Sequence, residues 1–576
     1  MTYTTGKDSR VASLTAKVIH GKTYYYAREC QRVDGKPKIV RTVYLGSADE
    51  LIAAATKQKH GQAPQPQSVD IAAFGDVVAL YDLAQQIGLV ELLDRHVPKR
   101  DQGLSVGQYL LLAAINRAVH PTSKRQFADW YRETTLPRLI PAAAAQLSSQ
   151  AFWNHLDFIE ERHIEAIERE LSQRLIQQFQ LSLRTLTYDG TNFFSFIDTC
   201  TPGELAQRGH NKQKRNDLRQ VSLGMLVSTD FHIPLFHKVY AGNVPDCTIF
   251  KTVTEELRRR YVELARECEH ITLVFDKGNN SEEAFQTLDE SEFHFVGSLV
   301  PSHHAELLDV PVNVYQPLAG ERLKDCRAYR TKRVVFGQER TIVVTHNDNL
   351  LHGQLQGLTA ALEKARDKLR DLQAKLRRRR EGRTRGGKAP TVASLRKQAQ
   401  DALAGQHVKT VLHVEVEDGD VPTLSFETDQ AALSRLIRTQ LGKTILFTDN
   451  DDWTSEEIVL GYRSQHHIED AFRQMKHPHY LGWSPMFHWT DSKIRVHAFT
   501  CVLALTLSSL LQRTLYHKGL DLSLPRIFEL LGGIREMLVI YPRKQGQRQH
   551  STARAISTLS TQQSQILDAL NLHRYR

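Results

Sequence analysis

The chain has 576 residues, with 75 Lys and Arg against 65 Asp and Glu, a formal net charge of +10 and a pI of about 9.1. This length allows three or four domains, and the mildly basic balance suits a polyanionic partner without requiring one. Six cysteines without a CxxC pair exclude a zinc finger and a disulfide framework, and they fit a reducing cytoplasm. The N-terminus has no apolar signal-peptide core. The apolar run at 497–511 is too short to span a bilayer, so we expect a buried core helix there and no membrane partner.

Residues 1–59 carry the pattern of a small β-hairpin domain. The segments AKVIHGKTYYYARECQRV and KPKIVRTVYLG are rich in β-branched and aromatic residues and flank a turn at Val33–Lys36, so we expect two antiparallel strands. The following HGQAPQPQS (60–68) has two prolines and no hydrophobic periodicity, which indicates a linker.

Residues 69–181 show a helical pattern. The segments 105–119 and 121–134 flank a short break and resemble a helix-turn-helix, with Lys124 and Arg125 at the start of the second helix. In that arrangement the start of the second helix contacts bases or phosphates, so both residues are candidate DNA-binding residues. The alternative is an ordinary helical hairpin without DNA contacts.

Residues 182–300 predict the first part of an α/β core. Strands interleaved with helices imply a mixed sheet with helices on its faces. The expected strands are 183–189, 192–198, 220–228, 233–241, 271–276 and 294–300. Asp189 and Asp276 each close a strand-like run, so we expect both at the carboxyl ends of strands. The alternative for each is an aspartate that merely forms a turn beside a glycine.

The loop from Arg208 to Arg219 holds five Lys or Arg residues and one His against Asp217 alone. Phosphate contacts supply much of the affinity of DNA-binding proteins, so Lys212 and Arg215 are candidate backbone contacts. A solvated charged loop is the alternative.

An insertion is expected at 301–441, because 193 residues separate Asp276 from Glu469. Seven leucines and one alanine between Leu351 and Leu376 alternate at spacings of four and three, which is typical of a coiled-coil seam. The basic stretch RRRREGRTRGGK (377–388) and a second helical segment follow, so we predict a helical arm with a basic tip, flanked by strands. The seam can pack on its own hairpin partner or on a second protomer.

Residues 442–576 predict the second part of the core and the C-terminal helices. One stripe of an expected long helix combines a carboxylate, a phenol, an amide and two cations at spacings of 3, 4, 4 and 3. Its members are Tyr462, Gln465, Glu469, Arg473 and Lys476. A second, apolar stripe would anchor the helix to a core. Its members are Ile468, Phe472 and Met475. A solvated, salt-bridged helix face is the alternative for the first stripe.

Asp189, Asp276 and Glu469 together form the candidate catalytic site. Mg²⁺ prefers oxygen ligands, and Mn²⁺ accepts the same set. A pair of such ions stabilises the attacking and leaving oxygens of a phosphodiester displacement. We therefore predict a site for two Mg²⁺ or Mn²⁺ ions held by these carboxylates.

The order Tyr462, two residues, Gln465, three residues, Glu469, six residues, Lys476 resembles the Tyr–Arg–Glu–Lys signature of bacterial insertion-sequence DDE transposases of family four. The resemblance also covers 208–228, VYAGNVPD ending at Asp246, and 487–507, so that it runs from about 188 to 511. Gln465 departs from the signature, which has Arg at this position. Arg463 and Arg473 are the candidates for the missing cation.

This resemblance implies a ribonuclease-H-like catalytic core that cuts DNA at terminal inverted repeats and joins it to target DNA. It further implies DNA contacts by Tyr462, Arg463, Arg473 and Lys476, a homodimer in the synaptic complex, and a bacterial, nucleoid-associated location. Relatives stack a base on a Trp of the insertion. No Trp occurs between residues 277 and 452 here, so Tyr315 and Tyr329 become the candidates for that role.

Two other functions stay open. One is a ribonuclease-H-like nuclease without strand transfer, and the other is an inactive relic that only binds DNA. The arm and the N-terminal region argue against the first, and the three carboxylates argue against the second.

Overall fold

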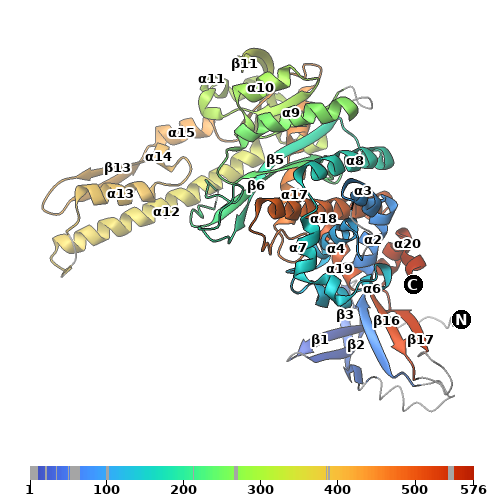
Figure 1. Cartoon of the computed structure of the whole chain (residues 1–576). Helices are drawn as coiled ribbons and strands as arrows, with labels where there is room; N and C mark the ends of the chain where they lie inside the picture. Colours follow the sequence, from blue (N-terminus) through green and yellow to red (C-terminus); the bar gives the residue numbers. More distant parts are fainter. Residues whose placement is uncertain are drawn as a thin grey trace.

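The computed structural model describes residues 11–19, 22–33, 36–49, 51, 65–98, 103–211, 213–264, 270–384, 386, 389–542 and 551–576. Within these residues the strands form four sheets, the largest with nine strands. Figure 1 shows a central body, a long arm that leaves it on one side, and a group of strands at one end that includes both β1–β3 and β16–β17.

The N-terminal sheet has three strands where the sequence predicts two. The strands are β1 (Val11–Ile19), β2 (Lys22–Val33) and β3 (Lys36–Ser47). The first expected strand divides, because Ile19 pairs with Lys22 and the chain reverses between them. The predicted turn joins β2 to β3, since Val33 pairs with Lys36, although Asp34 and Gly35 lie outside the described residues.

A second small sheet joins the two ends of the sequence. The last residue of the expected linker and the first five residues of the predicted helical region form a strand instead, β4 (Ser68–Ala73). It pairs with β16 (Arg535–Ile540), and β16 pairs with β17 (Thr552–Ile556). The sequence pattern does not indicate this pairing, because its strands are more than 460 residues apart.

The predicted helical region is helical, but the helix-turn-helix expectation is wrong in its second helix. The helices are α2 (Gly75–Gln86), α3 (Leu89–His96), α4 (Val106–Val119), α5 (Phe127–Arg132), α6 (Leu136–Leu139), α7 (Ser149–Leu156) and α8 (Glu161–Phe179). Ser105 caps α4 by accepting the Gln108 N–H at 3.1 Å, and the Gln108 side chain accepts the Ser105 N–H in return. Lys124 and Arg125 precede α5, which is only six residues long, so no second helix presents them to a groove.

The half of the large sheet that contains residues 185–298 has strands of both directions. Its strands are β5 (Thr185–Ser195), β6 (Arg219–Ser228), β7 (Pro234–Ala241), β8 (Thr272–Val274) and β9 (His294–Ser298), and its helices are α9 (Asp246–Leu264) and α10 (Glu282–Asp289). They lie in the order β7-β6-β5-β8-β9. The pairs β5–β8 and β8–β9 are parallel, and β5–β6 and β6–β7 are antiparallel.

One correction concerns Asp189, which lies in the middle of β5 rather than at a strand end. The two strands expected around Asp189-Gly190 are one continuous strand, in which Gly190 pairs with Gly224 of β6. Both glycines make room for tyrosines. A Cβ at Gly190 would lie 2.6 Å from the Tyr240 hydroxyl, and one at Gly224 would lie 2.5 Å from the Tyr188 hydroxyl.

Strands of the insertion extend the same sheet beyond β9. They are β10 (Gln316–Pro317), β11 (Cys326–Val335), β12 (Gln338–Asn347) and β15 (Lys443–Thr448), in the order β10-β11-β12-β15-β9. Short helical turns lie between the strands of this region: η3 (Pro301–His303), α11 (Ala305–Leu308), η4 (Val312–Val314) and η5 (Glu321–Leu323). Three further short turns lie elsewhere in the described chain: η1 (Ala144–Leu147), η2 (Lys277–Asn279) and η6 (Leu572–Tyr575).

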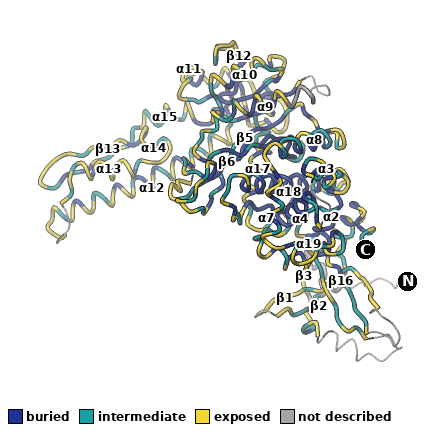
Figure 2. The backbone as a smooth tube through the Cα atoms, in the orientation of Figure 1, coloured by how far each residue is buried: buried dark blue, intermediate teal, exposed yellow. Residues whose placement is uncertain are grey.

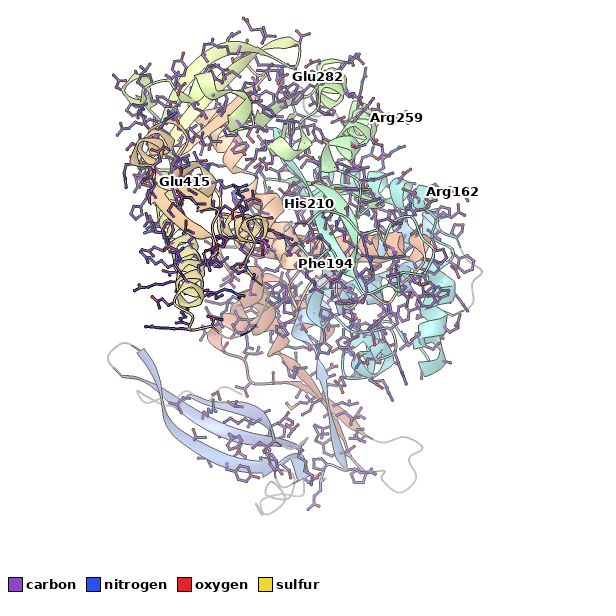
Figure 3. All side chains as sticks on the ribbon, turned by 90° about the vertical axis from the view of Figure 1, so that its left-hand side faces the viewer. Arg162, Phe194, His210, Arg259, Glu282 and Glu415 are labelled. Atoms are coloured by element: carbon purple, nitrogen blue, oxygen red, sulfur yellow. The ribbon has the colours of Figure 1, made fainter. Side chains whose placement is uncertain are left out.

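The arm consists of α12 (Asp348–Arg380), α13 (Val392–Ala402), α14 (Val408–Val411), β13 (Leu412–Glu417), β14 (Thr423–Thr428) and α15 (Gln430–Thr439). It projects from the body in Figure 1, and much of its outer surface is exposed in Figure 2. Viewed along the arm (Figure 3), Glu415 of β13 lies on one side, and Glu282 of α10 and Arg259 of α9 lie on the other.

The leucine seam of α12 packs inside the arm. Leu358, Leu362 and Leu369 are buried in one cluster with Leu395 of α13 and Leu424 of β14. Of the two alternatives for the seam, the structure therefore has packing within the same chain.

The helix expected around Glu469 is divided into two. The helix α16 (Ser455–Arg463) ends in a tight turn, in which the Ser464 hydroxyl donates to the Gly461 carbonyl at 2.5 Å. The next helix, α17 (His466–Met475), begins immediately after this turn. The expected stripe is thus wrong as a single helical face, since Tyr462 belongs to α16 and Lys476 follows the end of α17.

The C-terminal part adds α18 (Asp491–His517), α19 (Leu524–Gly532) and α20 (Thr561–Ala569). Among the described residues α18 is the one helix long and apolar enough to cross a membrane, and 94% of its most apolar window is buried inside the protein. It packs against α2, α4, α8 and β7, so one hydrophobic core spans the N-terminal helices and the catalytic sheet.

Candidate active site

A pocket of about 380 Å³ gathers the three predicted carboxylates. Asp189 comes from β5, Asp276 from the turn after β8, and Glu469 from the first turn of α17. The other lining residues are Gly190, Thr191, Asn192, Gln213, Asp246, Lys277, Gly278, Asn279, Gln465, Ile468 and Lys476.

Asp276 is held by two hydroxyl donors. The Tyr462 hydroxyl donates to its Oδ1 at 3.2 Å, and the Ser298 hydroxyl of β9 donates to the same oxygen at 3.1 Å. Burial, followed by the Asp276 charge, raises the pKa of the Tyr462 phenol, which therefore stays a neutral donor at physiological pH. Ser298 and its contact with Asp276 are not visible in the sequence pattern.

Asp246 is a fourth carboxylate in the pocket that the sequence analysis did not select as a site residue. It begins α9, and its Oδ1 accepts a hydrogen bond from the Tyr240 hydroxyl at 2.6 Å. Burial raises the pKa of Tyr240, and the nearby Asp246 carboxylate adds to the shift. The signal was present in VYAGNVPD, but an aspartate in a first helical turn also suits the helix dipole and so carries no necessary function.

The backbone of α17 is fixed by its apolar side chains. Ile468, Phe472 and Met475 are buried in the main core, as the second stripe predicts, so Glu469 is left on the exposed side of the helix. At the end of α17, the Lys476 ammonium donates to the Thr191 hydroxyl at 2.5 Å and lies 5.3 Å from the centre of the Phe193 ring. The contact places a cation beside the carboxylates.

The pocket offers the donors that a hard cation takes. Four carboxylates and the amides of Asn192 and Asn279 line it, and the buried Oδ1 of Asn279 has no hydrogen-bond partner among the described residues. Within those residues no three His, Cys, Asp or Glu side chains are close enough together to hold a metal ion. The donor chemistry thus fits a divalent cation, while the carboxylates share a pocket without forming a closed ligand set.

Gln465 stands where the signature has Arg. Its side chain lines the pocket, and its amide nitrogen is buried with no hydrogen-bond partner in the described part of the chain. A neutral donor therefore points to the position where the resemblance predicts a cation.

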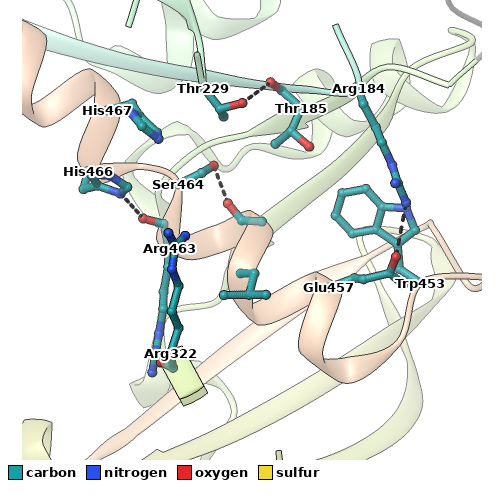
Figure 4. Close-up of a pocket in the computed structure, with 12 residues that line it drawn as sticks. Arg184, Thr185, Thr229, Arg322, Trp453, Glu457, Arg463, Ser464, His466 and His467 are labelled. Carbon is teal, nitrogen blue, oxygen red and sulfur yellow. Dashed lines mark hydrogen bonds and ion pairs between the residues drawn. The ribbon is translucent and has the colours of Figure 1, made fainter. Parts of the chain in front are cut away.

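The two arginines expected to replace that cation lie outside this pocket. Arg473 forms an ion pair with Asp470 at 2.5 Å on the exposed side of α17. Arg463 donates to the Arg322 carbonyl at 2.6 Å and lines a separate pocket of about 730 Å³, shown in Figure 4. In that pocket Arg184 lies 5.7 Å from the Trp453 ring.

The basic loop before β6 reaches the active site through Gln213. Arg215 is engaged by a double hydrogen bond to Asp217 at 2.8 Å, and Arg219 donates to the Thr201 carbonyl at 2.9 Å. Lys212, the other predicted contact in this loop, lies outside the described residues. Lys124 and Arg125 line a third pocket, about 620 Å³ in volume, with α7 and residues 485–489.

Among curated proteins none matches the chain. Among solved structures, a piggyBac transposase synaptic complex with hairpin DNA is similar over 79% of this chain and 78% of that chain, with 9% sequence identity and a TM-score of 0.35. The family model described as transposase DDE domain matches residues 194–507, more than half of the chain, and includes Asp276 and Glu469, with Asp189 five residues before its start. The chain therefore belongs to the DDE-domain transposase family.

Proposed function

We propose that this transposase cuts DNA at the terminal inverted repeats of its own insertion sequence and joins the freed 3′ ends to target DNA. The observation that carries the proposal is the shared pocket of Asp189, Asp276 and Glu469, with Lys476 and Tyr462 beside them. The spacing of Tyr462, Gln465, Glu469 and Lys476 supports a place among the bacterial family-four enzymes.

The order and directions of the strands support a ribonuclease-H-like core. In such a core three antiparallel strands are followed by two that run parallel to the first, which matches β7-β6-β5-β8-β9. Asp189 then lies on the central strand β5 and Asp276 directly follows the neighbouring strand β8, while the glutamate comes from a helix that packs on β5 and β6.

Asp189, Asp276 and Glu469 would hold two Mg²⁺ or Mn²⁺ ions, which stabilise the attacking and leaving oxygens of an in-line displacement. Asp246 and the Asn279 amide are further oxygen donors in the same pocket. Tyr462 and Ser298 orient the Asp276 carboxylate by hydrogen bonds to one of its oxygens, which leaves its other oxygen for the ion. Lys476 and the amide of Gln465 would hold the phosphate beside the carboxylates.

The DNA partner would be held by surfaces around the pocket. We place Arg473, Arg463, Arg215 and Lys212 on the flanking phosphate backbone, because the first three lie outside the pocket on elements that adjoin it. Two ends must be brought together for insertion, so a homodimer is the proposed working form.

Excision from the native locus, read by sequencing of the junctions, tests this function. Glu469→Gln keeps the size of the side chain but removes the charge, so it abolishes cutting while DNA binding is retained. Glu529→Gln is the matched control, because it makes the same change at an exposed glutamate of α19 that pairs with Arg526 outside the pocket. Excision by Glu469→Gln at the wild-type level would refute the assignment.

The products also separate the two alternatives. Precise junctions together with new insertions indicate a transposase. Glu469-dependent cutting without joined products indicates a nuclease, and DNA binding without any cutting indicates an inactive relic.

A further inference from the structure

A third pocket lies away from the carboxylates, between the N-terminal helices and the loop that joins α17 to α18. Its volume is about 620 Å³. It is lined by Arg117, Ser123, Lys124, Arg125, Ser149, Gln150, Phe152, Trp153, Pro485, Phe487, His488 and Trp489. The transposase reaction described above uses none of these side chains.

Aromatic rings form one wall of this pocket. The Trp153 ring of α7 lies 4.8 Å from the Trp489 ring, with 30° between their planes. Trp489 is 53% exposed and the nearby Phe487 is 68% exposed, which is unusual for such large apolar side chains. Exposed aromatic surface that gathers at a concave site is typical of a ligand-binding surface.

The charged residues of the lining are all cationic. Arg117, Lys124 and Arg125 contribute three basic groups, and none of the twelve lining side chains is acidic. Arg117 is 2% exposed and donates to the Thr122 carbonyl at 3.1 Å, yet its Nε has no hydrogen-bond partner among the described residues. The Nδ1 of the buried His488 is likewise unpartnered within that part of the chain. A buried cation, two further basic groups and unpaired polar nitrogens, with no carboxylate in the lining, favour an anionic ligand.

An aromatic wall beside clustered cations matches the chemistry of a nucleotide, whose base stacks and whose phosphate is anionic. We propose that this pocket binds one nucleotide of single-stranded DNA, with the base against Trp153 and Trp489 and the phosphate against Lys124 and Arg125. This binding site rests on the proposed transposase function, because cutting at the transposon ends is what would supply unpaired DNA.

A continuous set of contacts connects this pocket with the active site. Lys476 contacts Thr191 beside the carboxylates, and two residues further along β5 Phe193 stacks on Trp483 at 4.2 Å. The Trp483 carbonyl accepts a hydrogen bond at 2.8 Å from the Nε2 of His497, whose ring lies 5.6 Å from that of His488. The segment from Lys476 to Trp489 thus begins at the carboxylates and ends at the aromatic wall, which suits one DNA strand that spans both sites.

The first test compares two 12-nucleotide probes with the full chain by fluorescence anisotropy. One is (dT)12, and the other has the same sugar-phosphate backbone without bases. Stacking of a base gives wild type a preference of about 10-fold or more for (dT)12. Trp489→Ala reduces that preference to near one, whereas Tyr516→Ala, which removes a half-exposed aromatic ring of α18 outside the pocket, keeps it.

A second measurement follows the phosphate. Burial and the nearby Arg117 lower the pKa of Lys124 to about 7, so this amine is mostly neutral at pH 8 in the free protein. A bound phosphate raises that pKa again, and (dT)12 binding at pH 8 is accompanied by proton uptake, measured by calorimetry in Tris and in HEPES. Lys124→Arg keeps a cation at this position but abolishes the proton uptake, because the arginine is already protonated in the free protein. The neighbouring basic groups Arg117, His488 and Lys493 are unchanged in this variant.

Equal affinity of wild type for both probes, or an unchanged preference in a folded Trp489→Ala variant, would overturn the proposal. Thermal melting of each variant establishes that it is folded. Both probes lack transposon ends and are also measured with Glu469→Gln, so the pocket result does not depend on cutting. Equal affinity of wild type for both probes together with normal excision refutes the pocket alone, and a base preference of wild type without any excision refutes the transposase reaction alone.

Discussion

At the residue scale, the chemistry of the site depends on groups that keep each carboxylate in place. Asp276 shows this most directly, because the hydroxyls of Tyr462 and Ser298 donate to the same oxygen. A hydrogen bond to a charged group contributes about 1.5–3 kcal/mol, roughly a 10- to 150-fold effect on an equilibrium. Uncharged side chains beside the triad therefore contribute to its function by orienting a carboxylate.

Tyr462→Phe is expected to slow DNA cutting by about 10- to 100-fold while the protein stays folded, because it removes only the donated hydrogen bond. Burial and Asp276 raise the pKa of this phenol above its usual value of 10, so the hydroxyl stays protonated at every pH up to 10. The deficit should therefore be the same at pH 7 and pH 9, as measured by single-turnover cleavage. Tyr516→Phe serves as the control. Full activity of Tyr462→Phe, or a deficit that disappears at pH 9, would contradict this role.

The sequence predicts the triad because each member has a local signal: Asp276 follows a strand-like run, and Glu469 lies in a spaced motif. It does not predict Asp246, whose role depends on β7 and α9 bringing Tyr240 and β5 to it. It places Arg463 beside the carboxylates in place of the missing cation, although this last residue of α16 donates to the Arg322 carbonyl and lines another pocket. The spacing of the motif does not reveal the direction of this side chain.

At the element scale, two corrections concern features that a local sequence pattern does not reveal. Asp189-Gly190 has the sequence of a turn but stays within β5, since Gly190 is needed to accommodate the Tyr240 hydroxyl. The tight turn at Ser464 keeps the i to i+3 spacing of a helix, so the periodicity of Tyr462 and Gln465 does not reveal the break between α16 and α17. The first correction depends on a tertiary contact and the second on a local hydrogen bond.

The arm is an element whose stability can be tested separately, because its core is a cluster distinct from the main one. Leu369 of α12 is fully buried there, so Leu369→Ala should cost about 2–5 kcal/mol in the unfolding of the arm. Amide hydrogen exchange should show lost protection in α12, α13 and β14, with β5 and α18 unchanged.

Leu350→Ala on the same helix is the control, since that side chain is 39% exposed and should change stability by less than about 0.5 kcal/mol. Uniform loss of protection across the catalytic sheet in Leu369→Ala would show that the arm and the body unfold together. A dependence of the effect on protein concentration would instead place the seam between protomers.

At the scale of the whole molecule, the N-terminal helices, the sheet and α18 share one hydrophobic core. The domain boundary predicted at residue 181 therefore marks the change from helices to strands within one packed body. The pairing of β4 with β16 joins the two ends of the chain in the same way. Long-range pairings of this kind have no local signal, whereas the insertion was predictable because it lengthens the interval between two recognisable site residues.

The arm leaves and rejoins the sheet at one point. His346 of β12 pairs with Lys443 of β15, and the Asn347 N–H donates to the Gly442 carbonyl at 2.8 Å. A two-residue Asn-Gly turn in place of residues 348–441 would therefore close β12 and β15 as a hairpin. No residue of that interval belongs to the main core among the residues described.

We expect this armless variant to fold, with the thermal unfolding of the body preserved, because its core and sheet stay complete. Four consecutive arginines, Arg377–Arg380, end α12, about 50 Å along a 33-residue helix. If they contact phosphates, loss of the arm makes the dependence of log affinity on log salt shallower by up to about 4. Replacement of Arg377–Arg380 by Gln in the intact arm should reproduce that change, as measured by anisotropy with duplex DNA at several salt concentrations. An unfolded armless variant would show that the arm is required by the body. An unchanged salt dependence in both variants would show that the DNA lies against the body alone.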